Sequence, residues 1–149
     1  MTTRPLRPWL EREHEHWLAE VAEALGPAQR PEAGPWARWS ALRYLETTFP
    51  ERVERERQMV EVLAARLTEP QRARLWALGE LLDVLPDYLG HLVGLCHRAA
   101  EFAALTGRLQ ATLGRWCRAL EEDLGPLPAS ALPAKLRGAV APSEEVPVG

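Results

Sequence analysis

The sequence predicts an all-α protein, and three observations carry this prediction. Leu (24) and Ala (22) dominate the 149 residues, Ile and Asn are absent, and Val occurs only nine times; this composition favours helix over strand. Apolar residues recur at gaps of three and four, which is the helical period. Proline and glycine clusters divide the chain into segments of helical length. We expect an up-down four-helix bundle over residues 1–125 and a Pro-rich extended tail over 126–149.

The first two helices are predicted from their flanking breakers. Pro5 and Pro8 precede an expected helix over residues 9–25, and a loop rich in proline and glycine follows over 26–35. The second helical stretch runs over 36–67 and is expected to be interrupted at Pro50, because proline lacks the amide donor that a helix interior needs.

The third helix is predicted from one long apolar pattern, and the fourth from a turn signal and an apolar face of its own. Thr68 has the properties of an N-cap, with Pro70 near the first helical turn. Pro86 is expected to kink or divide the third helix. Thr106 and Gly107 are expected to form the turn into a fourth helix over 108–124. The pattern comprises Leu75, Leu78, Leu82, Leu85, Leu89, Leu92, Cys96, Ala99 and Ala103.

Charge and composition exclude several classes of function. The net charge of −3 argues against a nucleic-acid partner, because proteins that bind nucleic acids are generally basic. No apolar run reaches the length of a membrane span, so no membrane partner is expected. The N-terminal residues lack the apolar stretch of a signal peptide. Two cysteines are too few for a disulfide framework, and we therefore expect a cytoplasmic protein.

The informative polar residues are those that share the phase of the apolar faces. His14 lies four residues after Leu10 and three before Trp17, so it is expected to face the interior, whereas His16 faces solvent. Glu56 holds an interior phase on the second helix and needs a partner if it is buried. Cys117 and Glu121 flank the apolar face of the last helix, and Cys96 belongs to the third. His14 and Glu56 should approach within hydrogen-bonding or metal-bridging distance.

Each of these residues also has a purely structural interpretation. His14 could be a hydrogen-bonded core histidine, and Glu56 could pair with Arg52 one turn earlier. Cys96 and Cys117 could act as small buried apolar side chains. His91 and His97 are expected at the surface. The six tryptophans are interpreted as core and rim packing, because no basic stripe accompanies them.

Three stretches resemble the hemerythrin-like (HHE) family of four-helix bundles. Glu13-His14 resembles the family's opening helix, which supplies the first iron ligand. The segment 42–50, followed by Glu54, Glu56 and Met59, resembles its second helix. The segment 120–127 resembles the end of its last helix. The resemblance implies the bundle fold and, in complete members, a di-iron centre that binds oxygen.

The ligand set that the resemblance implies is depleted in this chain. Thr48 stands where the second-helix histidine is expected, Arg52 occupies the position one turn on, and Cys117 replaces the last-helix histidine. A di-iron site needs about five histidines and two carboxylates. His14, Glu56, Cys117 and Glu121 remain as candidate metal ligands. We expect no bound cofactor; the alternative is iron or another transition metal at these residues, with Arg52 supplying positive charge in its absence.

Three functions compete at this point. The first is a non-catalytic hemerythrin-like module for regulation or protein interaction, which binds an unknown protein or a second copy of itself. The second is a single-metal or redox sensor that uses His14, Glu56 and Cys117. The third is an assembly chaperone for a molybdenum-dependent reductase, since residues 85–89 (Leu-Pro-Asp-Tyr-Leu) are similar to a segment of those chaperones. The sequence contains no recognisable nucleophile–base pair and no phosphate-binding glycine loop, so we do not expect an enzyme.

Overall fold

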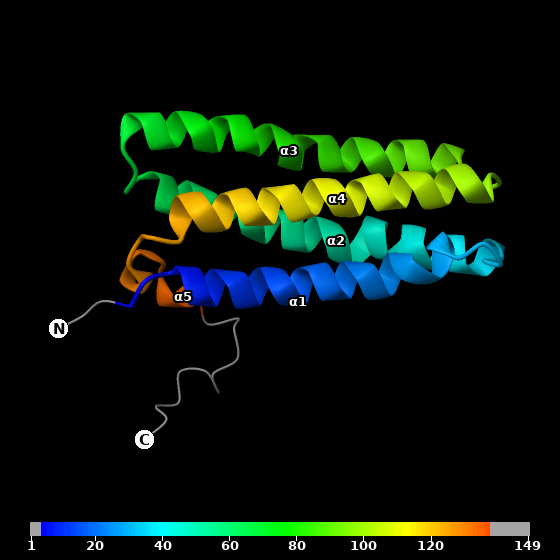
Figure 1. Ribbon diagram of the computed structural model, residues 1–149, viewed down its shortest axis with the longest axis horizontal. Coiled ribbons are helices and arrows are strands. Elements are labelled where there is room, and N and C mark those ends of the chain that lie inside the picture. The colour runs from blue at the N-terminus through cyan, green and yellow to red at the C-terminus, as the bar shows by residue number, and fades with distance from the viewer. Residues whose placement is uncertain (1–3, 138–149) are drawn as a thin grey trace, which may run out of the picture.

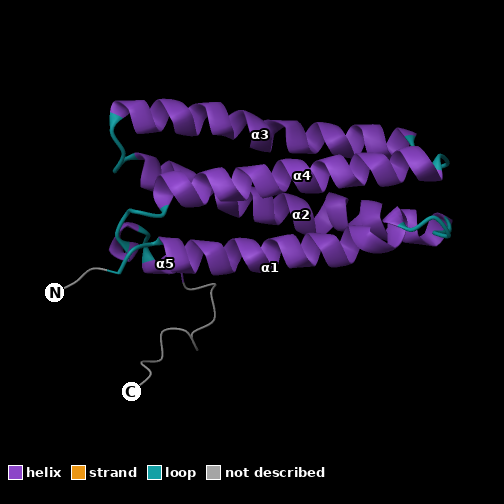
Figure 2. Ribbon diagram, viewed as in Figure 1, coloured by secondary structure: helices purple, strands orange, loops and turns teal. Residues whose placement is uncertain are grey.

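The computed structural model describes residues 4–137, and within this range every regular element is helical (Figure 2). The all-α prediction is therefore confirmed. The elements are α1 (Arg7–Leu25), the 3-10 helix η1 (Gly26–Gln29), α2 (Pro35–Ala64), α3 (Glu69–Gly94), α4 (Ala99–Leu124), the 3-10 helix η2 (Ala129–Ala131) and α5 (Ala134–Arg137).

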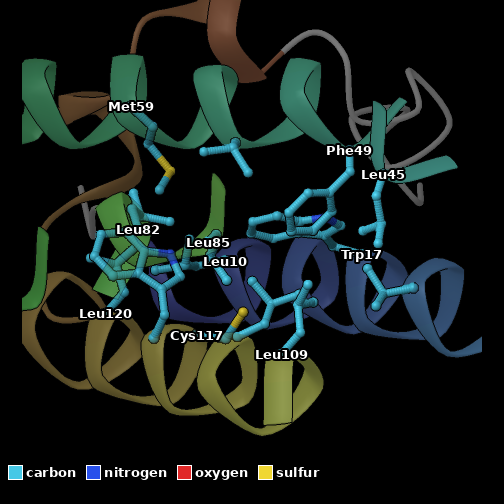
Figure 3. Packing of buried hydrophobic residues seen from close by; sticks show 14 of the residues in the cluster. Leu10, Trp17, Leu45, Phe49, Met59, Leu82, Leu85, Leu109, Cys117 and Leu120 are labelled. Carbon is cyan, nitrogen blue, oxygen red and sulfur yellow. The ribbon is translucent and has the colours of Figure 1, made fainter. Parts of the chain in front are cut away.

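The four long helices lie side by side, and the chain reverses direction between each of them and the next (Figure 1). Helix α4 packs mainly against α3 and α1, while α2 contacts α1 and α3. Trp17 and Phe49 meet at 5.8 Å between ring centroids, next to buried leucines of the other helices (Figure 3). One continuous apolar core results, into which each helix turns one face.

The start of α3 follows the predicted capping residues. Thr68 is the N-cap, and its Oγ1 accepts a hydrogen bond from the backbone N of Gln71 at 3.4 Å. The Gln71 side chain accepts in return from the Thr68 backbone N at 2.8 Å. This reciprocal pair is a capping box, and with Pro70 in the first turn it explains why the helix begins here.

The two internal prolines do not divide their helices. This corrects the predicted interruption at Pro50, and of the two alternatives at Pro86, a kink or a division, it excludes the division. Helix α2 is continuous across Pro50 and α3 is continuous across Pro86. Both prolines are exposed, while Phe49 and Leu85 beside them are buried. Tertiary packing on the inner face therefore holds each helix together despite the missing amide donor.

The reversal between the last two helices lies at residues 95–98, whereas the sequence predicted it at Thr106 and Gly107. The predicted fourth helix over 108–124 is therefore too short, because α4 begins at Ala99. Thr106 is buried within α4 and donates from Oγ1 to the Ala103 carbonyl at 2.8 Å. The three-and-four spacing misled the prediction because it continues across the reversal, although Ala99 is in fact exposed. The Leu78 side chain lies outside the described part of the chain.

The segment after α4 packs on the bundle as far as Leu136, so this part is not the extended tail that the sequence predicted from 126 onward. The backbone N of Leu6 donates to the Leu127 carbonyl, and that of Ala129 donates to the Arg4 carbonyl, both at 2.7 Å. Leu132 is fully buried. Ala131 is also buried, and Leu127 and Leu136 pack against the core, so apolar side chains anchor a segment whose prolines indicated an exposed chain. The rest of the predicted tail, 138–149, lies outside the described residues.

Candidate functional site: a buried chain of ion pairs

The centre of the site is His14, which α1 points into the core with 1% of its surface exposed. Its Nε2 lies 2.7 Å from a carboxylate oxygen of Glu56 on α2. Its Nδ1 lies 2.7 Å from a carboxylate oxygen of Glu121 on α4. The predicted approach of His14 to Glu56 is confirmed, and Glu121 joins them from the opposite side of the ring.

Glu56 has a complete set of partners although its side chain is only 2% exposed. Its Oε2 also accepts a hydrogen bond from the indole Nε1 of Trp116 at 2.9 Å. Its Oε1 lies 3.4 Å from Arg52 Nη1, one helical turn earlier on α2. The Arg52 pairing that the sequence offered as an alternative therefore exists together with the histidine contact.

The ion pairs continue from Glu56 to the surface. Arg52 lies 3.7 Å from Glu13 and stacks over the Trp17 ring at 4.8 Å from its centroid. Glu13 in turn accepts a hydrogen bond from Arg55 at 3.0 Å. Positive and negative groups alternate along this chain, so each buried charge has a neighbour of opposite sign.

The electrostatics favour a doubly protonated imidazole. Burial disfavours the charged ring, but Glu56 and the Cys117 side chain outweigh burial and raise the pKa of His14 to about 11. Burial alone would raise the pKa of Glu56, yet His14, Arg52 and Trp116 bring it below its usual range. Both ring nitrogens of His14 then donate to carboxylates, and the centre is a carboxylate–imidazolium–carboxylate chain.

The two cysteines differ in their relation to this centre. Cys117 is fully buried on α4, beside His14. Burial raises the pKa of its thiol, although the His14 charge acts against that rise. Cys96 does not belong to the interior set, contrary to prediction. It is half-buried after the end of α3, where its carbonyl accepts a hydrogen bond from Arg38 Nε at 2.7 Å.

The residues present do not fit a metal ion in this arrangement. A histidine binds a metal through a ring-nitrogen lone pair, and both nitrogens of His14 are engaged by carboxylates. A thiol binds as the thiolate, which the raised pKa of Cys117 disfavours. Across residues 4–137, as far as side chains are described, no group of three or more His, Cys, Asp or Glu residues is arranged to hold a metal.

Sequence reasoning placed His14 and Glu56 in the interior, where the structure has them, but it missed the role of Trp116. Trp116 was expected only as an inward apolar residue, but its indole is a donor to Glu56. A buried tryptophan generally needs an acceptor, which was the available signal. Thr48 is exposed, so the position where the resemblance expects a histidine faces away from the core. His16, His91 and His97 are exposed, as predicted.

The tryptophans and the 85–89 segment also have defined places. Trp17 and Trp116 are core residues, and Trp9 packs against the core. Trp36, Trp39 and Trp76 are 81%, 68% and 67% exposed, which contradicts core or rim packing for these three. The 85–89 segment lies inside α3, with Leu85 buried and the Tyr88 hydroxyl 3.2 Å from Thr112 Oγ1.

Comparison with protein-family models, with curated proteins and with solved structures finds no match to this chain. Among the described helices, none is both long enough and apolar enough to cross a membrane.

Proposed function

We propose that this chain is a hemerythrin-like up-down four-helix bundle that works without a metal and without catalysis, as a regulatory or protein-interaction module. The observation that carries the proposal is the position of His14 between two carboxylates, each 2.7 Å from one of its ring nitrogens. In this proposal the imidazolium supplies the positive charge that iron supplies in complete members of the family.

Arg52 and Cys117 support the same conclusion. Cys117 stands where the resemblance expects the last-helix histidine, and Arg52 lies one turn after Thr48, where the resemblance expects the second-helix histidine. Arg52 instead brings a fixed positive charge to Glu56, and Cys117 brings a thiol whose pKa is raised by burial. Positive charge at Arg52 opposes binding of a cation at Glu56, since like charges repel.

The exposed tryptophans support an interaction role. Trp36 and Trp39 lie three residues apart on α2, so they share a face near its start. Tryptophan is enriched at the energetic centres of protein interfaces. The partner could be a second copy of the chain or a different protein. Sedimentation of the wild-type chain, compared with that of the variant Trp36→Ser/Trp39→Ser, distinguishes these two partners. Association that this variant loses indicates a second copy, whereas a wild-type monomer leaves a different protein as the partner.

Elemental analysis of protein purified without chelator or affinity-tag metal tests the metal-free proposal. We expect far less than one equivalent of any transition metal and no visible absorption band. Addition of ferrous iron or zinc should not change the thermal unfolding temperature. Near-stoichiometric metal, lost in His14→Leu and retained in His16→Leu, would overturn the proposal.

One observation favours a second candidate, a single-metal or redox sensor. Cys117 is fully buried and adjoins His14, which is the orientation that such a sensor requires. Mass spectrometry after mild peroxide treatment separates this candidate from the first. Oxidation at Cys117 before Cys96 would favour the sensor, whereas oxidation at Cys96 alone favours the module.

A further inference from the structure

A second feature of the structure is an open groove between α3 and α4, which shares no residue with the His14 centre. It has a volume of about 630 Å³, within the range of small-molecule sites. Three arginines of α4 line it together with polar side chains of both helices. The main lining residues are Tyr88, Arg108, Gln110, Thr112, Arg115 and Arg118.

The charge of this groove is one-sided. None of the described residues that line it is acidic. Arg115 donates a hydrogen bond to Thr112 Oγ1 at 3.3 Å, and none of Arg108, Arg115 and Arg118 forms an ion pair within residues 4–137. Most of the other arginines on the long helices do pair with carboxylates, as Arg57 does with Asp83. Clustered guanidinium groups repel one another, so an anion between them would be stabilising.

Small residues on α4 leave room for the guanidinium groups. Arg118 lies over Gly114, where an added Cβ would meet its Nη1 at 3.6 Å. Ala111 lies on the same side of the helix. Arginine presents a planar fork of donors that matches phosphate oxygens two at a time, which a lysine cannot do.

An apolar groove adjoins the arginines. It has a volume of about 480 Å³ and shares Tyr88 and Arg108 with the first groove. Val84, Leu95 and Leu105 form its apolar walls. Asp87 is also part of its lining, and its negative charge repels a phosphate from this end. A ligand with one anionic end and one apolar end would therefore bind in a single orientation.

We propose that the arginine-lined groove and the adjoining apolar groove together bind a free organic phosphate. Its phosphate oxygens lie between Arg108, Arg115 and Arg118. Its apolar or aromatic part lies towards Leu95 and Leu105. A small ligand suits the groove better than a nucleic acid does. The three groove arginines lie on one side of α4, and the chain as a whole has a net charge of −3.

Calorimetric titration with two probes of similar charge, inorganic triphosphate and ATP without magnesium, tests the proposal. We expect one saturable site for ATP and weaker binding of triphosphate, because triphosphate has no group for the apolar half. The titration is made at near-physiological ionic strength, where screening suppresses diffuse binding to surface charge. The groove variant is Arg108→Gln/Arg115→Gln/Arg118→Gln, and its affinity for ATP should fall by about tenfold or more.

A matched control removes the same charge elsewhere. Arg30, Arg43 and Arg66 are exposed and, like the groove arginines, form no ion pair within the described chain. The variant Arg30→Gln/Arg43→Gln/Arg66→Gln should bind ATP within about twofold of the wild type. Circular dichroism checks that both variants are folded. If the groove triple variant unfolds, Arg118→Gln alone should still weaken binding by about threefold.

Several results would overturn the proposal. These are the absence of saturable ATP binding by the wild type, an equal loss of affinity in the groove and control variants, or triphosphate binding as tightly as ATP. Binding only to phosphatidic acid vesicles would assign the arginines to a lipid surface. Arginine-dependent binding of single-stranded DNA tighter than that of ATP would assign them to a nucleic acid. Either result would contradict a free organic phosphate.

Discussion

Removal of the His14 imidazole should destabilise the protein more than removal of the whole ion pair. In His14→Leu, the Glu56 carboxylate stays buried at 2% exposure and loses its closest cationic partner. Breaking a buried pair in this way costs about 3–5 kcal/mol. Trp116 and Arg52 remain beside the carboxylate, so the lower half of that range is expected.

The variant His14→Leu/Glu56→Met removes both charges and keeps the volume similar. Its main loss is the acceptor of the Trp116 indole, which costs about 1–3 kcal/mol. Arg52 is 15% exposed and still has Glu13 at 3.7 Å, so it keeps a partner. The double variant should therefore be more stable than His14→Leu alone, although it carries one more substitution in the core.

Equilibrium urea unfolding at neutral pH, followed by far-ultraviolet circular dichroism, measures both free energies of unfolding. His16→Leu is the matched control, because His16 is exposed two residues further along the same helix. It should change stability by less than about 0.5 kcal/mol. The reasoning fails if His14→Leu lies within about 1 kcal/mol of the wild type, or if the double variant is the less stable of the two.

Three further predictions concern the pKa of His14, the two cysteines and the space around two glycines. The pKa of His14 rises from 6.5 to about 11 on folding, so the stabilisation is fully present below pH 6.5 and is lost as the pH rises towards 11. The free energy of unfolding should fall by up to about 1.4 kcal/mol per pH unit in that interval, and a His14→Leu protein with the same slope would contradict the assignment. In the native protein a thiol reagent should modify Cys96 first and Cys117 only on unfolding, because Cys117 is buried and its pKa is raised; equal rates in thiol counting would refute this. Gly125→Ala should destabilise by about 1–3 kcal/mol, because its Cβ would collide with the Glu121 carbonyl and lie 2.9 Å from Arg7 Cβ. Gly107→Ala, in open space within α4, should instead stabilise by about 0.5–1 kcal/mol, and thermal unfolding that ranks the two in the opposite order would show the packing at Gly125 to be wrong.

The helical class and the inner positions could be predicted from the sequence because they depend on periodicity. The phase of Leu10 and Trp17 placed His14 correctly, and that of Phe49 and Val53 placed Glu56. The reversal at 95–98 could not be found in this way. The three-and-four spacing of apolar residues runs from Leu92 through Cys96 to Ala99 without a break, and Ala99 keeps that spacing although it is exposed.

The prolines and the segment after α4 show the other limit of the sequence. Proline disfavours a helix interior at any position in a sequence. Pro50 and Pro86 are nevertheless tolerated, because both are exposed on the outer face of a packed helix. Leu132 and Ala131 are neighbours in a short segment, so their burial gives no periodic signal. The Trp116–Glu56 bond depends on the relative rotation of two helices, which a spacing pattern does not contain.

The backbone bonds that tie residues 4–7 to 125–129 have a consequence for how the molecule opens. Leu6, Arg7 and Ala129 donate their amide hydrogens across this seam, and Leu127, Gly125 and Arg4 accept them. Neither of these two segments can fray while the other stays in place. Their amides therefore belong to a single local unfolding unit, and the start of α1 should exchange with solvent at the same rate as the segment after α4.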